Sequence, residues 1–360
     1  MKIINPPEYI EEVNYQNAID KYLIQLEIIQ DDVIAVYQMG SVGTPGLSDI
    51  DLIVVVKDDF KPENSTYLSA KAIDNRLFLH DPIIIPKSIC SVFPYVFHAT
   101  SLNILYGVDC IADFSSQSKL EIESLSLCYL IDIISMRLLQ FAKTKSTGVF
   151  DQRAWATRIW SVTHSYNIMK SIGLSLPSDA EFMLDELFLF RKNWNEKHTF
   201  DKRLLLKTYE TSLLLFLKII EQAISTYKSM NGKELNLYFE TMKVLSSKDI
   251  STPRFICKKH TIFGVSFFVY KCYHNILYSC HLSGYGFLNL TDRLDDNLKE
   301  HFNIMKKRRK VIESHKIWLN KHTPNTDSLA GNLGVLQTWK KSYKKNILSI
   351  LFRTLDKLRK

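Results

Sequence analysis

The sequence predicts an α+β protein with several domains, and three observations support this prediction. The chain has 360 residues, enough for two or three domains of ordinary size. It contains 46% apolar and 23% charged residues, so it can bury a sizeable core. Its apolar pattern changes from short β-branched runs near the N-terminus to a helical repeat of about 3.6 residues in the middle of the chain. We therefore expect a mixed-sheet α/β unit, then a helical domain, a small β-rich segment and a basic helical tail.

Residues 1–118 are expected to form the α/β unit. Residues 9–30 carry apolar side chains at helical spacing and follow a Pro-Pro pair, which predicts an amphipathic helix. Residues 57–76 are expected to be a polar connection with part of a helix. The second strand contains the run Ile-Val-Val-Val, which implies that both faces of the sheet are covered. The expected strands are residues 32–38, 49–56, 76–86 and 104–114.

Residues 119–232 are expected to form the helical domain, and residues 233–335 a mixed region. In the mixed region, residues 253–290 are rich in aromatic and β-branched side chains, and residues 292–321 have a helical pattern. Residues 336–360 predict a basic amphipathic helix. The four helices expected in the helical domain are residues 121–143, 153–172, 179–194 and 202–228.

The basic charge is concentrated at the C-terminal end. Residues 301–360 hold 15 Lys/Arg and 3 Asp/Glu, a net charge of +12, which leaves −4 for the rest of the chain. The main body is therefore not expected to be a nucleic-acid-binding surface. The helix expected at residues 336–360 has three interpretations: it packs on the protein's own core, it lies on an anionic membrane, or it binds RNA phosphates.

The composition indicates a cytoplasmic protein, with peripheral membrane association as the alternative. The N-terminus lacks the long apolar run of a secretory signal. The most apolar stretch, residues 212–224, is too short to cross a bilayer. Buried free cysteines are the simpler interpretation of the Cys/His-rich segment, although a zinc site is the alternative. That segment contains Cys257, His260, Cys272, His274, Cys280 and His281.

The most informative stretch is residues 40–52, Gly-Ser-Val-Gly-Thr-Pro-Gly-Leu-Ser-Asp-Ile-Asp-Leu. Asp49 and Asp51 are two positions apart at the start of a strand, so both side chains point to one face. Two carboxylates on one face repel each other unless a cation lies between them, and Mg²⁺ or Mn²⁺ suits such oxygen ligands. Gly40 and Ser41 lie in a turn whose N–H groups and hydroxyl could contact a phosphate. Metal-binding acids beside a phosphate-binding turn indicate phosphoryl or nucleotidyl transfer.

This stretch resembles the signature of the DNA polymerase β-like nucleotidyltransferase superfamily, and the resemblance covers about residues 9–114. It implies a reaction that moves a nucleoside monophosphate from an NTP to an acceptor hydroxyl and releases pyrophosphate. It also implies that Gly40 and Ser41 contact the triphosphate, and that Asp49 and Asp51 bind two divalent ions, Mg²⁺ or Mn²⁺. Ser48, within the motif, is a further candidate for nucleotide binding.

A third acid from a neighbouring strand is also implied. Asp81 is the first candidate because it lies in the best remaining strand, where it could bind one ion and help to activate the acceptor hydroxyl. Asp109 and Asp113 are the alternatives. His80 could assist proton transfer, although a structural histidine is the simpler interpretation.

The expected helix 153–172 could supply further contacts to the substrates. Arg158 or Lys170 could meet the triphosphate and Tyr166 could stack on a base, against the simpler interpretation of a solvated basic face. The acceptor is left open between a small molecule, a sugar, glycan or lipid-linked hydroxyl, a protein hydroxyl and an RNA end. The alternative function is an inactive nucleotidyltransferase-fold module that senses nucleotides or serves as a scaffold for a partner or RNA.

Overall fold

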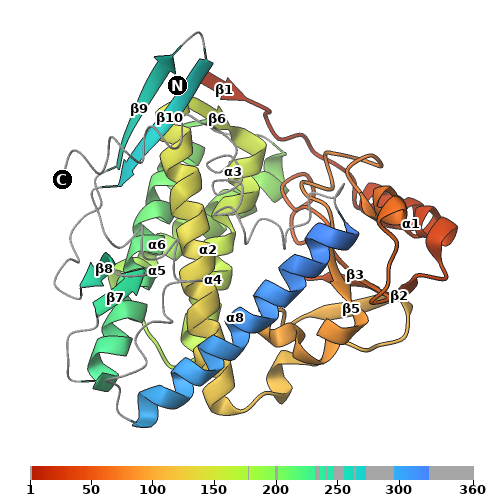
Figure 1. Cartoon of the computed structure of the whole chain (residues 1–360). Helices are drawn as coiled ribbons and strands as arrows, with labels where there is room; N and C mark the ends of the chain where they lie inside the picture. Colours follow the sequence, from red (N-terminus) through yellow and green to blue (C-terminus); the bar gives the residue numbers. More distant parts are fainter. Residues whose placement is uncertain are drawn as a thin grey trace.

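A four-stranded sheet near the N-terminus and a group of long helices make up most of the structure (Figure 1). The computed structural model describes residues 2–176, 178–198, 202–231, 236–239, 242–246, 255–262, 265–272 and 296–323. Within these residues the protein is mixed α/β, which confirms the predicted class at that level.

The main sheet is mixed and has the strand order β4-β3-β2-β5. β3 runs parallel to β4 and antiparallel to β2, and β5 pairs antiparallel with β2. Because β3 and β4 are parallel neighbours, the segments that enter them lie at the same edge of the sheet. The strands are β2 (Val33–Met39), β3 (Asp51–Val56), β4 (Ile83–Pro86) and β5 (Leu102–Gly107).

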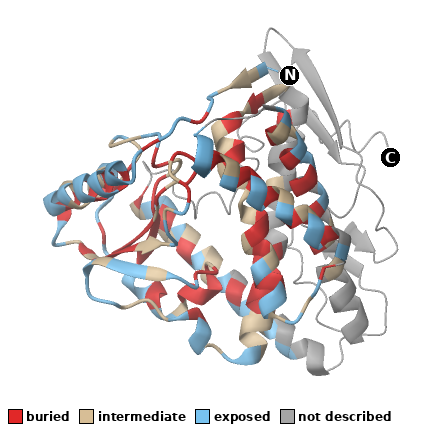
Figure 2. Cartoon of the chain, turned by 180° about the vertical axis from the view of Figure 1, so that it is seen from behind, coloured by how far each residue is buried: buried red, intermediate tan, exposed pale blue. Residues whose placement is uncertain are grey.

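Both faces of this sheet are covered, as the apolar run in β3 predicts. Val54 and Val56 pack with α1 (Glu12–Leu26), η1 (Glu27–Ile29) and η2 (Pro62–Leu68) on one face. Ile53 and Val55 pack with η3 (Lys87–Tyr95) on the other face. Figure 2 shows the strands of the sheet as largely buried.

Two of the expected strands are shorter in the structure. β4 starts at Ile83 and not at residue 76, because Asp74 accepts hydrogen bonds from the backbone of Arg76 and Phe78 and forms a turn there. β5 ends at Gly107, whose φ of +83° breaks the strand. The rest of the segment, which was expected to stay extended, contains the short helix η4 (Phe114–Ser116).

Long helices form the second part, and most of their expected bounds are close to the observed ones. The first begins with a capping box between Ser118 and Glu121 and ends at Gly148, which has a φ of +64°. The expected helix 153–172 is two helices that meet at Trp160. The helices are α2 (Lys119–Thr147), α3 (Gln152–Ile159), α4 (Ser161–Ser171), α5 (Ser178–Lys197) and α6 (Lys202–Asn231).

The remaining strands of the described residues form three small two-stranded sheets. β1 (Lys2–Ile4) pairs in parallel with β6 (Val149–Asp151), which the sequence did not predict. β9 (Phe255–Ile262) and β10 (Val265–Cys272) form a hairpin within the segment expected to be β-rich. β7 (Asn236–Phe239) pairs with β8 (Met242–Ser246). The side chains of the Cys/His-rich segment and the expected helix 336–360 lie outside the described residues.

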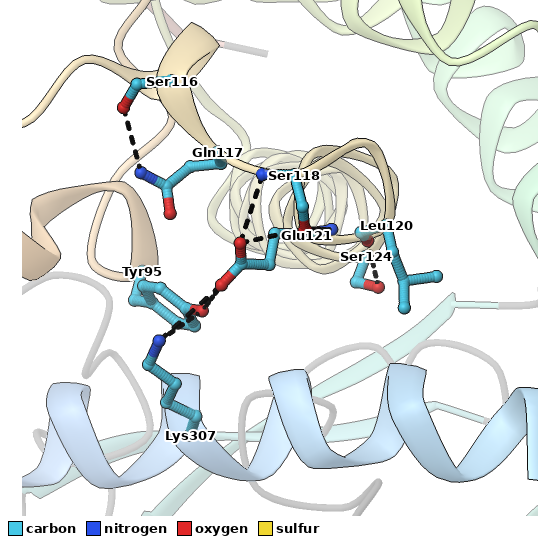
Figure 3. A network of polar contacts seen from close by, with 8 residues as sticks. All are labelled: Tyr95, Ser116, Gln117, Ser118, Leu120, Glu121, Ser124 and Lys307. Atoms are coloured by element: carbon cyan, nitrogen blue, oxygen red, sulfur yellow. Dashed lines mark hydrogen bonds and ion pairs between the residues drawn. The ribbon is translucent and has the colours of Figure 1, made fainter.

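α8 (Asp296–His322) lies across the sheet unit and the long helices (Figure 1). It contacts α2, β4 and η3. His315 Nε2 lies 2.8 Å from the carbonyl oxygen of Ile84, and the indole of Trp318 donates to the carbonyl of Asp58. Lys307 donates to the hydroxyl of Tyr95, which donates in turn to the cap residue Glu121 (Figure 3).

None of the helices in the described ranges combines the length and the apolar character needed to cross a membrane.

Candidate metal centre

Asp49, Asp51 and His80 form a group that could hold a metal ion. Their ligand atoms all lie within 4.8 Å of one another, and each of the three residues is half-buried. Asp49 and Asp51 stand where the chain enters β3, and His80 precedes β4. Since these parallel strands are neighbours, the three side chains meet at one edge of the sheet.

The electrostatics of the group fit a site for a cation. Burial raises the pKa of Asp49 to about 6, and the nearby Asp51 adds to this effect while His80 opposes it. Burial would lower the pKa of His80, but its 2.7 Å contact with Asp51 and the charges of both carboxylates raise that pKa to about 9. At neutral pH a protonated imidazole thus partly balances the carboxylate pair.

Asp81, the first candidate for a third acid, is not part of this group. It is buried, and its Oδ1 accepts hydrogen bonds from the hydroxyl of Ser69 (2.7 Å) and the backbone N–H of Ala70 (3.2 Å). These hydrogen bonds hold the Asp81 carboxylate at Ser69 and Ala70, whereas Nε2 of His80 lies 2.7 Å from the carboxylate of Asp51. The geometry thus places an imidazole where the sequence predicts a carboxylate.

The two alternative acids also lie elsewhere. Asp109 is exposed and accepts a hydrogen bond from Tyr37. Asp113 is exposed and caps η4, where it accepts from the backbone N–H of Ser115. Neither residue lines the cleft that contains the metal-capable group.

The turn before Asp49 has one exposed and one buried part. Gly40 has a φ of +73°, which favours glycine, and both Gly40 and Ser41 are exposed at the cleft. Ser48 is buried, and its hydroxyl accepts a hydrogen bond from the backbone N–H of Thr44 (3.0 Å). Ser48 therefore shapes the turn, whereas Gly40 and Ser41 face the space where a ligand would lie.

Side chains from both parts of the protein hold this turn. Tyr15 of α1 donates to the carbonyl of Ser48 and accepts from the N–H of Gly46, both at 2.9 Å. On the helical side, Trp194 of α5 donates to the carbonyl of Pro45 at 2.7 Å, and Thr157 of α3 donates to that of Leu47 at 2.6 Å. The helices thereby fix the position of the turn relative to the carboxylates.

The metal-capable group opens into a cleft of about 1590 Å³ between the sheet edge and the helices. Typical small-molecule pockets have roughly 300–1000 Å³, so this cleft could take two ligands side by side. The predicted Arg158 lines its helical side. Tyr166 and Lys170 do not line it, and the Tyr166 hydroxyl binds Glu181 instead.

The sequence interpretation missed two cleft residues, Arg137 of α2 and Arg191 of α5. Both stand among apolar neighbours, in the runs Ser-Met-Arg-Leu-Leu and Phe-Leu-Phe-Arg. An arginine inside the apolar pattern of a helix is the signal that could have identified them, because such a charge needs a partner.

Comparisons with protein-family models, with curated proteins and with solved structures find no match for this chain.

Proposed function

We propose that the protein is a metal-dependent nucleotidyltransferase with the multi-domain architecture implied by its resemblance to the DNA polymerase β-like superfamily. One observation carries the proposal: Asp49, Asp51 and His80 converge beside the exposed Gly40 and Ser41 in a large cleft. Carboxylates at the edge of a sheet, next to a turn that can bind phosphate, are suited to this reaction.

The residues of the group fit a divalent cation. The two carboxylates offer hard oxygen ligands, which suit Mg²⁺ and Mn²⁺. The imidazole of His80 favours Mn²⁺ of the two, because imidazole is a ligand of transition metals. We propose that His80 takes the third place that the resemblance gives to an acid.

In this proposal Asp49, Asp51 and His80 hold the metal, while Gly40 and Ser41 orient the phosphates of the NTP. A bound divalent cation supplies charge neutralisation and lowers the pKa of the acceptor hydroxyl. The acceptor hydroxyl would give its proton to solvent, its oxygen would form a bond to the α-phosphorus, and the bond to the leaving pyrophosphate would break. The turn positions the donor because Tyr15, Thr157 and Trp194 fix it from three helices.

An inactive nucleotide-binding module is the second candidate. It is favoured by one observation, that the metal-capable group found among the described residues contains two carboxylates and not three. Both candidates bind a nucleotide with a metal, and they differ only in turnover.

The test measures transfer of α-³²P label from each of the four NTPs to a panel of acceptors, with Mg²⁺ or Mn²⁺. Asp49→Asn and Asp51→Asn should each abolish transfer, because each removes a charged metal ligand. Asp109→Asn, an exposed acid outside the cleft, is the matched control and should keep the wild-type rate. A near wild-type rate in either cleft variant would contradict the proposal.

Thermal unfolding tests the nucleotide site that both candidates share, and the transfer assay then separates the two. An NTP at about 100 times its Kd should stabilise the protein by about 2.7 kcal/mol. A metal-dependent shift that is lost in the Asp49→Asn/Asp51→Asn protein establishes the nucleotide site. A shift without transfer to any acceptor favours the inactive module.

A further inference from the structure

Three arginines from three helices line the helical side of the cleft, opposite the carboxylates. They are Arg137 of α2, Arg158 of α3 and Arg191 of α5. Arg191 is only 9% exposed, and the other two are half-buried. The charge of Arg158 lowers the pKa of Arg137, so these two lie close enough to repel each other, and an anion bound in the cleft would relieve that repulsion.

Arg191 has an unsatisfied hydrogen-bond donor in this position. Its guanidinium lies 4.1 Å from the centre of the Trp160 ring, and its Nε is buried without a hydrogen-bond partner. Within the described ranges, no carboxylate lies at ion-pair distance from Arg158 or Arg191. A buried charge that the protein itself leaves unpaired is a place where a ligand can supply the counter-charge.

The charge of Asp49, on the carboxylate side of the cleft, affects the pKa of all three arginines. Burial lowers the pKa of Arg137 and Arg191 to about 10 and also lowers that of Arg158, while the charge of Asp49 raises all three. All three therefore stay cationic at neutral pH. They lie close enough for the charge of Asp49 to raise their pKa values. Within the described residues, Arg158 and Arg191 form no ion pair with Asp49.

Without the three arginines, a bound nucleoside triphosphate would leave an excess of negative charge in the cleft. A nucleoside triphosphate carries about four negative charges at neutral pH, which two divalent cations would offset. Asp49 and Asp51 add two more negative charges in the same half-buried space. The three guanidinium groups of the cleft can balance this remainder.

We propose that Arg158 and Arg191, with Arg137 beside them, form a binding site for a polyphosphate chain that works without a metal ion. The planar guanidinium fork matches two phosphate oxygens at once, which an ammonium group cannot do. Only the identification of this polyphosphate as the triphosphate of a donor nucleotide rests on the proposed function.

The experiment is calorimetric titration of the full chain with inorganic tripolyphosphate in the presence of EDTA. Arg158→Gln and Arg191→Gln should each weaken binding about 10- to 100-fold, because each removes charge-assisted hydrogen bonds. Arg76→Gln is the matched control: Arg76 is an exposed arginine outside the cleft, and its loss should leave binding unchanged.

Three results would overturn the site. They are no tripolyphosphate binding to the wild type in EDTA, undiminished binding in both cleft variants, or an equal loss in Arg76→Gln, which would indicate general charge attraction. Unfolding midpoints check that the variants fold. Because Arg191 is packed on Trp160, the less buried Arg158 keeps the test valid if Arg191→Gln does not fold.

The Asp49→Asn/Asp51→Asn protein separates this inference from the proposed function. It should retain tripolyphosphate binding, because the arginines do not need the metal. If that binding persists but no NTP is ever turned over, the transfer proposal fails and the site stands. If transfer occurs at an undiminished rate in Arg158→Gln and Arg191→Gln, the identification of the bound polyphosphate as the donor triphosphate fails. Tighter binding of an NTP than of tripolyphosphate supports a nucleotide as the source of the chain, and equal affinity contradicts that source.

Discussion

Asp49 and Asp51 could be found from the sequence because a strand has a regular period of two, which places alternate residues on one face. His80 and Asp81 are different, since they lie in an irregular segment where the alternation of the flanking strand does not fix the direction of a side chain. The chain turns at Asp74, β4 starts only at Ile83, and in the segment between them it is His80 and not Asp81 that contacts Asp51. No local pattern contains that information.

His80 and Asp81, the two candidates for the third metal ligand, can be distinguished by the effect of their substitution on the free energy of unfolding and on Mn²⁺ affinity. Asp81→Asn should lower the free energy of unfolding by about 1–3 kcal/mol, because a buried acceptor of two hydrogen bonds is altered. It should leave Mn²⁺ affinity almost unchanged. His80→Ala should weaken Mn²⁺ binding instead. Urea unfolding and calorimetric Mn²⁺ titration measure the two effects, and the reverse pattern would restore Asp81 as the ligand.

At the scale of elements, the sequence predicts β2, β3 and the long helices well because their apolar patterns are continuous. The break at Trp160 was not predicted, since it arises where Ser161 and Thr163 bond to backbone carbonyls of the preceding turn. The turn of residues 40–48 belongs to this scale too. The glycines in the sequence predict the turn. Which of them must be glycine depends on residues from distant parts of the chain that pack against the turn.

Gly46 is the position where the turn depends most on glycine. Its φ is +86°, and an added Cβ would lie 2.4 Å from the carbonyl oxygen of Glu8. Gly46→Ala should therefore cost about 1–3 kcal/mol of stability and displace the turn that carries Ser41. Gly43→Ala, where an added Cβ meets nothing within 4 Å, should be almost neutral. Urea unfolding compares the two variants, and equal stability would contradict this account.

At the scale of the whole molecule, the arrangement of α8 and the pairing of β1 with β6 could not be predicted. Both bring together residues that are distant in sequence, and no local sequence pattern in either element indicates which element it will contact. α8 docks on the sheet through His315, which is buried and contacts the carbonyl of Ile84. The expected domain boundaries at residues 118 and 232 stay predictions.

His315 should make this docking sensitive to acid. Burial lowers its pKa to about 4 in the folded protein, against about 6.5 when unfolded. Between these values the unfolded chain binds a proton that the native state does not, so stability is lost as the pH falls. The loss from pH 7 to pH 5 should be about 2 kcal/mol. Urea unfolding of His315→Gln should show a smaller pH dependence than the wild type, and an identical dependence would exclude His315 as the source.

The docking of α8 also has a consequence for biosynthesis. The hydrogen bond between Trp318 and Asp58 joins residues 260 positions apart. A ribosome adds roughly 5–20 residues per second, so α8 emerges about 13–52 seconds after the strands that it will cover. During that interval the nascent sheet exposes the apolar surface later covered by Val311 and Leu319. For those seconds the growing chain carries an aggregation-prone apolar surface that the finished protein covers.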